Sequence, residues 1–192
     1  MPRSAWGVGS PASRTCAAHT EPLALWHHIP VAKRSEGPGT QATLALAAAG
    51  IRFVAHVYEH DPANTNFGLE AASALSLDPE RVFKTLLADL DGELVVGIVP
   101  VTGKLDLKGL AAALGGKKAE MADPKLAERR TGYVVGGISP IGQKTRHRTV
   151  LDETAELWDT VYVSGGRRGF DLELAPADLV TITGAVVADI AR

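Results

Sequence analysis

The sequence predicts an α/β protein with a single domain and a mixed, strongly curved sheet. Segments of helix and strand character follow one another without the regular alternation of a doubly wound sheet. The chain has 192 residues, 45% of them hydrophobic, which is enough for one core without disulfide or metal staples. Its 20 Lys and Arg against 22 Asp and Glu give a formal net charge of −2. This composition excludes a disordered chain and a protein coated in basic residues.

The first 39 residues differ from the rest of the chain. They contain five of the eleven prolines and the single cysteine, Cys16, and they show no helical or strand period. We expect residues 1–39 to form a disordered or loosely packed extension and residues 40–192 to form the folded domain. One cysteine excludes an internal disulfide framework, and no apolar run reaches the roughly 20 residues that span a bilayer. We therefore expect a soluble, cytoplasmic protein that does not insert in a membrane.

Cap residues predict the first elements in order. Thr40 is a suitable N-cap for a helix that extends to Ala49 and stops at Gly50. Residues 51–58 are β-branched or aromatic in character and predict a strand, and residues 67–75 predict a second helix.

A hairpin is expected in the middle of the chain. The dipeptide Asp91-Gly92 favours a tight turn between strands at 82–90 and 93–101. Asp106 and Asp123 are suitable N-caps of two further helices, the second with Pro at its first position. The remaining sequence predicts short strands at 133–135, 149–151, 160–163, 170–174 and 185–189, with helices near Glu153 and Pro176.

Residues His56 to His60 match the H-x-x-E-H pattern of inverted zinc proteases. That chemistry needs a helix, on which the two histidines lie one turn apart and share a metal ion. This segment continues a predicted strand and runs into Asp61-Pro62. On a strand, residues four apart are about 13 Å from each other. We expect no metal site here.

Three segments carry unusual local chemistry, each with an ordinary structural alternative. Lys84 lies in an otherwise apolar strand, where it is a candidate site cation or an edge lysine that limits aggregation. Residues 136–143 are rich in glycine, as in a backbone that approaches a ligand closely or in a plain surface turn. Residues 164–169 are a candidate phosphate-binding loop or a hairpin loop, and Asp171 follows them.

Taken together, the motifs resemble a known family. The ordered motifs are Tyr58-Glu59-His60-Asp61-Pro62, Val82-Phe83-Lys84-Thr85-Leu86, Leu105-Asp106-Leu107-Lys108, Glu120-Met121-Ala122-Asp123-Pro124, Thr131-Gly132-Tyr133, Gly136-Gly137-Ile138-Ser139-Pro140-Ile141-Gly142-Gln143 and Tyr162-Val163-Ser164-Gly165-Gly166. This set closely resembles the YbaK/EbsC family, the Cys-tRNA(Pro) deacylases related to the editing domain of bacterial prolyl-tRNA synthetases. The resemblance runs from about Thr40 to Arg192.

The resemblance implies a mixed, partly open β-barrel-like sheet surrounded by helices. It implies an enzyme that deacylates mischarged Cys-tRNA(Pro) in trans, without a cofactor, a metal or a protein nucleophile. The cysteinyl substrate would supply its own thiol, and catalysis would rest on proximity. The partners would be the acceptor end of the mischarged tRNA and prolyl-tRNA synthetase as a helper. Editing of Ala-tRNA(Pro), or of another mischarged tRNA, and a non-catalytic module that binds a tRNA end are the alternatives.

The same resemblance assigns the site residues. Lys84 would contact the terminal adenosine or the carbonyl group, and the amides of Gly136 and Gly137 would support a developing oxyanion. The residues expected to bind the substrate are Tyr58, Phe67, Thr85, Ile138, Ser139, Ser164 and Asp171. The basic clusters that are candidates for RNA contact are Lys117 with Lys118, Arg129 with Arg130, Lys144 with Arg146 and Arg148, and Arg167 with Arg168.

Overall fold

A computed structural model describes residues 38–192, and the statements below concern this part of the chain. The expected extension over residues 1–39 lies outside the described residues, except for Pro38 and Gly39, and Cys16 lies outside them too. No helix among the described residues is long and apolar enough to cross a membrane.

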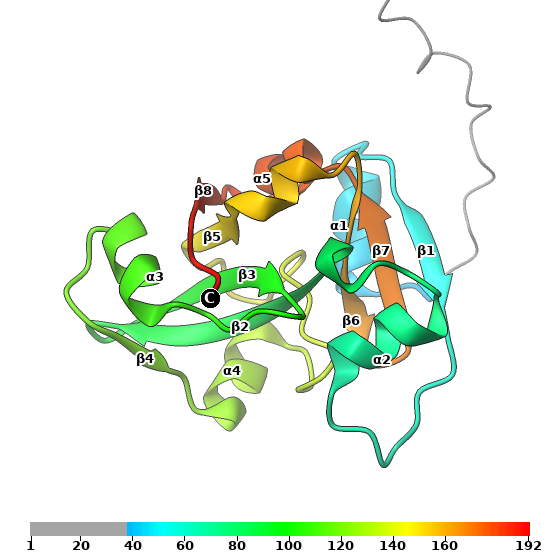
Figure 1. Ribbon diagram of the computed structural model, residues 1–192, viewed down its shortest axis with the longest axis horizontal. Coiled ribbons are helices and arrows are strands. Elements are labelled where there is room, and N and C mark those ends of the chain that lie inside the picture. Colours follow the sequence, from blue (N-terminus) through cyan, green and yellow to red (C-terminus); the bar gives the residue numbers. More distant parts are fainter. Residues whose placement is uncertain (1–37) are drawn as a thin grey trace, which may run out of the picture. The chain divides into compact units, whose positions relative to one another are not determined.

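The fold is built on one mixed sheet that does not close into a barrel (Figure 1). The strand order is β1-β7-β6-β2-β3-β5-β8, and β4 also pairs with β2. The β2–β6, β3–β5 and β5–β8 pairs are parallel, and the remaining pairs are antiparallel. The strands are β1 (Val54–Val57), β2 (Val82–Leu90), β3 (Glu93–Pro100), β4 (Ala119–Met121), β5 (Thr149–Asp152), β6 (Val161–Arg167), β7 (Phe170–Leu174) and β8 (Val186–Ala188).

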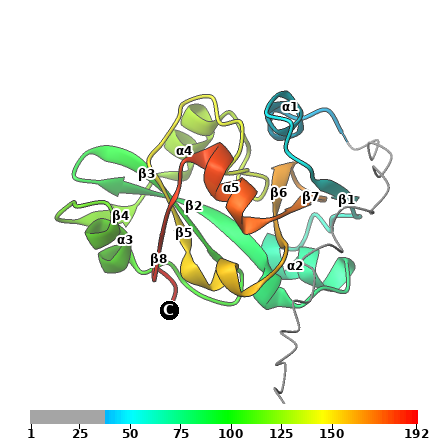
Figure 2. The same cartoon turned by 90° about the horizontal axis from the view of Figure 1, so that it is seen from above.

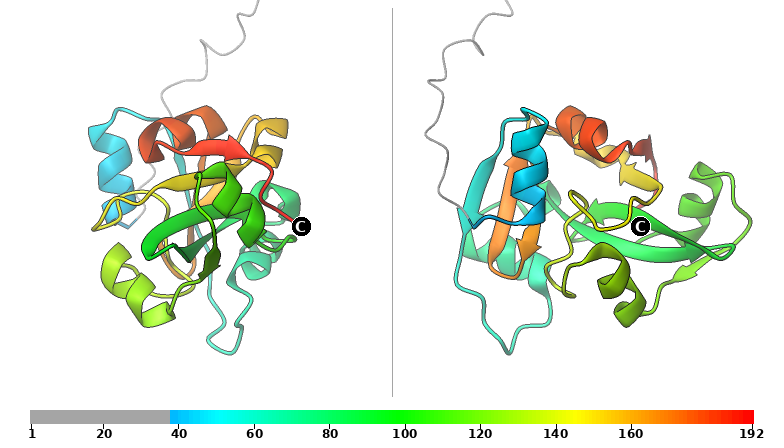
Figure 3. Two further views of the ribbon diagram at one scale, coloured as in Figure 1. Left: turned by 90° about the vertical axis from the view of Figure 1, so that its left-hand side faces the viewer. Right: turned by 180° about the vertical axis from the view of Figure 1, so that it is seen from behind.

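Five α-helices within residues 38–192 surround the sheet. They are α1 (Gln41–Ala48), α2 (Phe67–Ala74), α3 (Leu107–Ala113), α4 (Pro124–Thr131) and α5 (Pro176–Thr183), with 3₁₀ turns η2 (Pro79–Arg81) and η3 (Glu153–Leu157). The α4 and α5 helices lie on opposite sides of the β2–β3 hairpin (Figures 1 and 3). The α1 and α2 helices lie at the end formed by β1, β7 and β6, and α3 lies at the other end (Figure 2).

The predicted helix caps are confirmed. The Thr40 hydroxyl accepts a hydrogen bond from the Thr43 amide, and the Thr43 hydroxyl accepts one from the Thr40 amide. The α1 helix therefore begins with a reciprocal capping box. The Asp106 and Asp123 carboxylates accept hydrogen bonds from amides in the first turns of α3 and α4. The hairpin turn is also as predicted, since Asp91 and Gly92 both have positive φ, at 53° and 93°.

The main core lies between the sheet and the α1 and α5 helices. Phe170, Leu172 and Leu174 of β7 point into it and meet Leu46 of α1 and Leu179 of α5. The intervening β7 residues therefore face the opposite side of the sheet, because side chains alternate along a strand. That opposite face contributes to the functional site.

Two predicted strands need correction, and one observed strand was not predicted. The strand expected at 133–135 is wrong: this segment forms a turn, in which the Gly137 amide donates to the Val134 carbonyl. The Tyr133 hydroxyl donates to the Ile141 carbonyl at 2.7 Å, which holds that turn against the following loop. The three-residue β4 strand is absent from the predicted elements. The first predicted strand, 51–58, is shorter than expected.

The pairing of β2 has a gap that positions the site. On the edge that faces away from β3, β6 pairs with Val82 and Phe83, and β4 pairs with Ala88–Leu90. Within the described residues, no strand pairs with this edge between Phe83 and Ala88. A cavity lies alongside this stretch of β2.

Candidate functional site

The cavity has a volume of about 360 Å³, toward the small end of ligand-binding pockets. Its walls come from the loop before α2, the unpaired stretch of β2, the start of α4, the glycine-rich loop and the β6–β7 pair. Eight of the ten predicted site residues line it: Tyr58, Phe67, Lys84, Thr85, Gly136, Ile138, Ser164 and Asp171. Gly137 and Ser139 do not line it. The sequence motifs, which span more than a hundred residues, thus converge on one cavity.

Lys84 provides the cation of the cavity. Its Nζ donates hydrogen bonds to the carbonyl oxygens of Val101 at 3.2 Å and Gly103 at 2.6 Å. An ammonium group has three donors, so one remains for a ligand. Burial, and then the charge of Lys104, lowers the pKa of Lys84. The amino group of Lys84 is bonded to two backbone carbonyls and Lys84 lines the cavity, so it is not a solvated lysine that limits aggregation at a sheet edge.

The turn that holds Lys84 is itself anchored. The Lys104 amide donates to the Arg192 carbonyl at 2.8 Å, and the Arg192 amide donates back at 2.9 Å. The Arg192 guanidinium also forms an ion pair with Asp106, the N-cap of α3. These contacts fix the carbonyl groups that orient the Lys84 amino group.

Asp171 provides a carboxyl group on the opposite wall. In the sheet register it stands between Ser164 of β6 and His56 of β1, so the three side chains share one face. Burial raises the pKa of Asp171 to about 7, so the group is partly protonated near neutral pH. Burial, followed by the charges of Asp171 and Glu70, raises the pKa of the Tyr58 hydroxyl. Both Asp171 and Tyr58 line the cavity.

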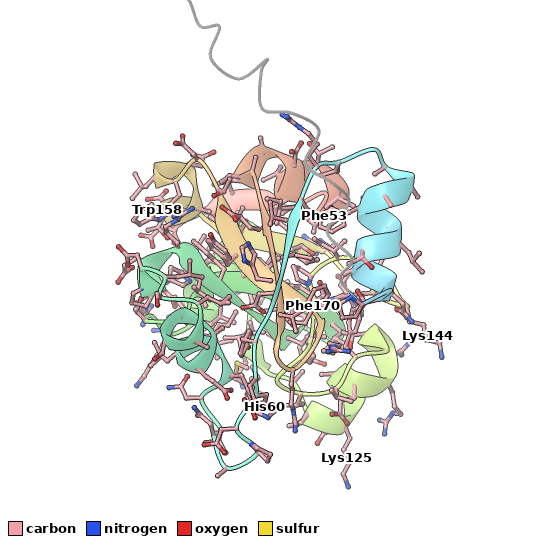
Figure 4. The ribbon with its side chains drawn as sticks, turned by 90° about the vertical axis from the view of Figure 1, so that its right-hand side faces the viewer. Phe53, His60, Lys125, Lys144, Trp158 and Phe170 are labelled. Atoms are coloured by element: carbon pink, nitrogen blue, oxygen red, sulfur yellow. The ribbon has the colours of Figure 1, made fainter. Side chains whose placement is uncertain are left out.

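Phe67 forms a fixed aromatic wall. The ring centroid of Phe67 lies 5.6 Å from that of His60. The guanidinium carbon of Arg168 lies 4.9 Å from the Phe67 centroid and makes a cation–π contact with that ring. His60 is held by Glu70 at 2.8 Å, and Arg168 Nε donates to the Val135 carbonyl at 3.0 Å. Figure 4 shows His60 beyond the end of β1. Sequence reasoning missed this bracing, because nothing local relates His60 or Arg168 to Phe67.

The two glycine amides have different environments. The Gly137 amide donates to the Val134 carbonyl at 2.9 Å within the turn. The Gly136 amide has no hydrogen-bond acceptor among the described residues, and Gly136 lines the cavity. Gly136 has a φ of 85°, and a Cβ there would lie 2.7 Å from the Phe67 ring. Of the two amides, only that of Gly136 is available to a ligand.

Ser139 lies below the cavity surface. It is fully buried, and its Oγ accepts a hydrogen bond from the Ile141 amide at 3.2 Å. Its carbonyl accepts from the Gln143 side chain at 2.9 Å. Ser139 therefore shapes the glycine-rich loop from within.

The hydroxyl groups in the cavity wall lack a basic partner among the described residues. Ser164 Oγ accepts from the Gly166 amide at 3.4 Å, and the buried Thr85 Oγ1 has no hydrogen-bond partner. The two histidines of the H-x-x-E-H pattern bond to separate carboxylates, His56 to Glu173 and His60 to Glu70. Among residues 38–192, no three His, Cys, Asp or Glu side chains are grouped to hold a metal ion.

Comparison with known proteins relates this fold and cavity to translation. A family model described as the aminoacyl-tRNA editing domain matches residues 63–182. An Enterococcus faecalis protein named "Putative Cys-tRNA(Pro)/Cys-tRNA(Cys) deacylase EbsC" is 42% identical over 121 residues, which are 62% of this chain and 73% of that protein. A proline–tRNA ligase of Moorella thermoacetica is 33% identical over 38% of this chain and 13% of its own length.

A solved structure shares the fold. The "Crystal structure of a putative trans-editing enzyme for prolyl tRNA synthetase" has a TM-score of 0.68 and 27% identity, over 79% of this chain and 95% of that one. The fold and these relatives therefore define an aminoacyl-tRNA deacylase, a hydrolase of the bond between an amino acid and its tRNA. The chain belongs to the aminoacyl-tRNA editing domain family.

Proposed function

We propose that this chain deacylates mischarged Cys-tRNA(Pro) in trans, and that residues 40–192 form the catalytic domain. The assignment of the substrate rests on the 42% identity to the Enterococcus faecalis protein, whose name gives cysteine as the amino acid on both of its tRNAs. Apolar fit discriminates weakly between amino acids of similar size, so a second hydrolytic site is a usual remedy for mischarging.

The size and lining of the cavity favour a ligand that is a small aminoacyl group on a terminal adenosine. The cavity volume of about 360 Å³ suits a ligand of that size, and the cavity wall combines apolar side chains with a few polar groups. Lys84 would contact the ribose, the phosphate or the acyl carbonyl through its remaining donor. Asp171 would bind the α-ammonium group of the substrate in its ionised form. Phe67, Tyr58 and Ile138 would form the apolar walls.

The proposed reaction uses the thiol of the substrate as the nucleophile. The sulfur forms a bond to the ester carbonyl carbon, the carbon–oxygen bond to the ribose breaks, and the thiol proton passes to the ribose oxygen. Water then opens the resulting thiolactone and releases cysteine. Lys84 and the Gly136 amide would stabilise negative charge on the carbonyl oxygen as the sulfur attacks. Holding the thiol against its own carbonyl is catalysis by proximity.

A release assay with three substrates tests the proposal. Cys-tRNA(Pro) should be cleaved quickly, and Ser-tRNA(Pro) should resist, since a hydroxyl is a far weaker nucleophile at neutral pH. Equal rates for the cysteinyl and seryl esters would indicate attack by water instead. Preferential release from Ala-tRNA(Pro) would make the chain an alanine editor. Tight tRNA binding without release of any amino acid would make it a binding module.

Prolyl-tRNA synthetase is the proposed helper. A site that contacts only the acceptor end cannot read the anticodon, so selectivity for tRNA(Pro) needs another source. The synthetase binds that tRNA, and the proline–tRNA ligase match relates its sequence to this chain. Adding purified synthetase should increase the preference for Cys-tRNA(Pro) over Cys-tRNA(Cys). An unchanged preference would contradict the helper role.

A further inference from the structure

The segment 124–148 has a charge opposite to that of the whole chain. It contains six Lys and Arg residues and one Glu, whereas the chain has 20 Lys and Arg against 22 Asp and Glu. The segment comprises α4 and the loop that leads to β5. Positive charge is thus concentrated in one part of the fold, and such a concentration attracts polyanions.

Two parts of this segment meet at the end of α4. The Lys144 amide donates to the Thr131 carbonyl at 2.9 Å, and the Thr145 amide donates to the Arg130 carbonyl at 3.1 Å. Figure 4 shows both Lys125 and Lys144 projecting outward, Lys144 at the right edge of the view and Lys125 at its lower edge. We call the resulting area the α4 basic surface, and it consists of Lys125, Arg129, Arg130, Lys144 and Arg146.

The cations of the α4 basic surface are not neutralised within residues 38–192. All five are exposed, and none takes part in an ion pair there. The two carboxylates on this helix are engaged with backbone amides, Glu128 with Val135 and Asp123 with Leu126. The charge of Arg130 also contributes, after burial, to lowering the pKa of the neighbouring His147.

Other basic residues of the domain differ in this respect. Lys118 forms an ion pair with Glu120 at 2.5 Å, and Arg148 forms one with Glu93 at 3.3 Å. Arg148 also donates to the Leu114 carbonyl, so its role is to hold the loop before β5 against α3. The structure therefore joins two of the candidate basic clusters into one surface and separates Lys118 and Arg148 from it.

The α4 basic surface adjoins the cavity. Pro124 and Ala127 line the cavity from one side of α4, and Val135, Gly136 and Ile138 line it from the following loop. The same segment thus supplies a cavity wall and an exposed cationic area.

We propose that the α4 basic surface binds the sugar–phosphate backbone of the acceptor stem of the tRNA whose aminoacylated end enters the cavity. This inference rests on the proposed function, since it takes the cavity as the site of the aminoacyl ester. Guanidinium groups bind phosphate in a bidentate manner, and exposed unpaired cations gain affinity by releasing counterions from a nucleic acid.

A matched pair of double variants tests the surface. Arg130→Gln with Lys144→Gln removes two adjacent charges, and Arg52→Gln with Lys108→Gln removes two exposed charges elsewhere. Binding of uncharged tRNA is measured by fluorescence anisotropy from about 50 to about 300 mM salt, a range over which the affinity for a nucleic acid changes strongly. The first variant should lower the log–log slope by about 0.9 for each duplex phosphate that it no longer neutralises, and the control should not.

Deacylation with two substrates separates the surface from the cavity. On cysteinyl-tRNA, kcat/KM of the first variant should fall by about tenfold or more, as expected when cations that neutralise phosphates are removed. On cysteinyl-adenosine, which has no stem, kcat/KM should stay that of the unchanged protein. Equal reductions on both substrates, or an unchanged salt slope, would overturn the proposal. A reduction seen only when prolyl-tRNA synthetase is present would assign the surface to that protein instead.

The measurement of tRNA binding does not depend on which amino acid the tRNA carries, because it uses uncharged tRNA. If the unchanged protein released no cysteine, the proposed function would fail, yet the salt dependence of uncharged tRNA binding would still support or overturn the α4 basic surface. Melting temperatures of both double variants guard against loss of folding as the cause.

Discussion

The Nζ atom of Lys84 lies 2.6 Å from the carbonyl oxygen of Gly103, to which it donates a hydrogen bond. A second bond to the Val101 carbonyl fixes the ammonium group on the turn after β3. The lysine is therefore held in place before any substrate binds, and preorganised charge is the form of electrostatic catalysis that costs no rearrangement during the reaction.

Removal of this charge should abolish most activity. Lys84→Met keeps the apolar stem and should lower kcat by about 10² to 10³-fold, the usual effect of losing one stabilising donor. Lys84→Arg should also be poor, because a planar fork does not fit a site built for a compact ammonium. Rates of amino acid release from Cys-tRNA(Pro) measure both effects, and Lys108→Met on the exposed side of α3 is the control. Full activity of Lys84→Met would return this lysine to a structural role.

Gly136→Ala should displace the Phe67 wall. The residue has a φ of 85°, and its new Cβ would lie 2.7 Å from the ring, so the ring or the loop must move. A displacement of about 1 Å near reacting groups can cost on the order of 10²-fold in rate. Single-turnover deacylation measures the effect.

Gly50→Ala is a matched control for that variant. Gly50 has a φ of 67°, and no atom lies within 4 Å of its Cβ position, so it carries the same backbone strain without a clash. Gly50→Ala should lose about 1–2 kcal/mol of unfolding free energy, the cost of a left-handed conformation, and Gly136→Ala should lose at least as much. Only Gly136→Ala should lose activity. A comparable loss of activity in both variants would attribute it to stability alone.

The sequence was sufficient to predict most elements of this domain because their signals are local. Caps at Thr40, Asp106 and Asp123 and the Asp91-Gly92 turn each depend on a few neighbouring residues. The 133–135 segment was mistaken for a strand because its apolar side chains are typical of one. Its turn is determined instead by bonds from Tyr133 to the Ile141 region and from Gly137 to Val134.

The site was less predictable than the fold because its contacts join distant segments. The apolar character of the surrounding strand makes Lys84 a candidate, yet nothing local indicates that its partners are the carbonyl groups of Val101 and Gly103. The family resemblance places Ser139, which lies in the glycine-rich loop, among the residues expected to bind the substrate. The burial of Ser139 depends on how that loop packs, which the local sequence does not encode.

Asp171 should make the stability of the protein fall as pH rises from about 4 to 7. Its pKa is raised to about 7 in the folded state by burial and has its ordinary value near 3.8 when unfolded. Between these values the native state keeps a proton that the unfolded state has released, so the unfolding free energy decreases with rising pH. Asp171→Asn removes this dependence and should stabilise the protein above pH 7. Denaturant unfolding between pH 4 and pH 8 measures the slope.

The same variant should lose activity if the carboxylate binds the substrate ammonium. The exposed Asp159→Asn is the control, and it should alter neither the slope nor the rate. An Asp171→Asn protein with the original pH slope would show that another group titrates in this range. An Asp171→Asn protein that is more stable and keeps its activity would show that the Asp171 carboxylate does not bind the substrate.

Substitution of Thr85 by valine should change the stability and the activity of the protein in opposite directions. The Thr85 Oγ1 is buried without a hydrogen-bond partner, beside the gap in the pairing of β2. An unsatisfied buried polar group costs about 1–3 kcal/mol, so Thr85→Val, which keeps the shape of the side chain, should raise the unfolding free energy by about 1 kcal/mol. We expect substrate binding to turn this hydroxyl toward the cavity by rotation about χ1, and Thr85→Val should therefore lower kcat/KM. Thr85→Ser retains the hydroxyl and should retain activity at lower stability. If Thr85→Val gained stability and kept its full kcat/KM, the hydroxyl would have no part in binding the substrate.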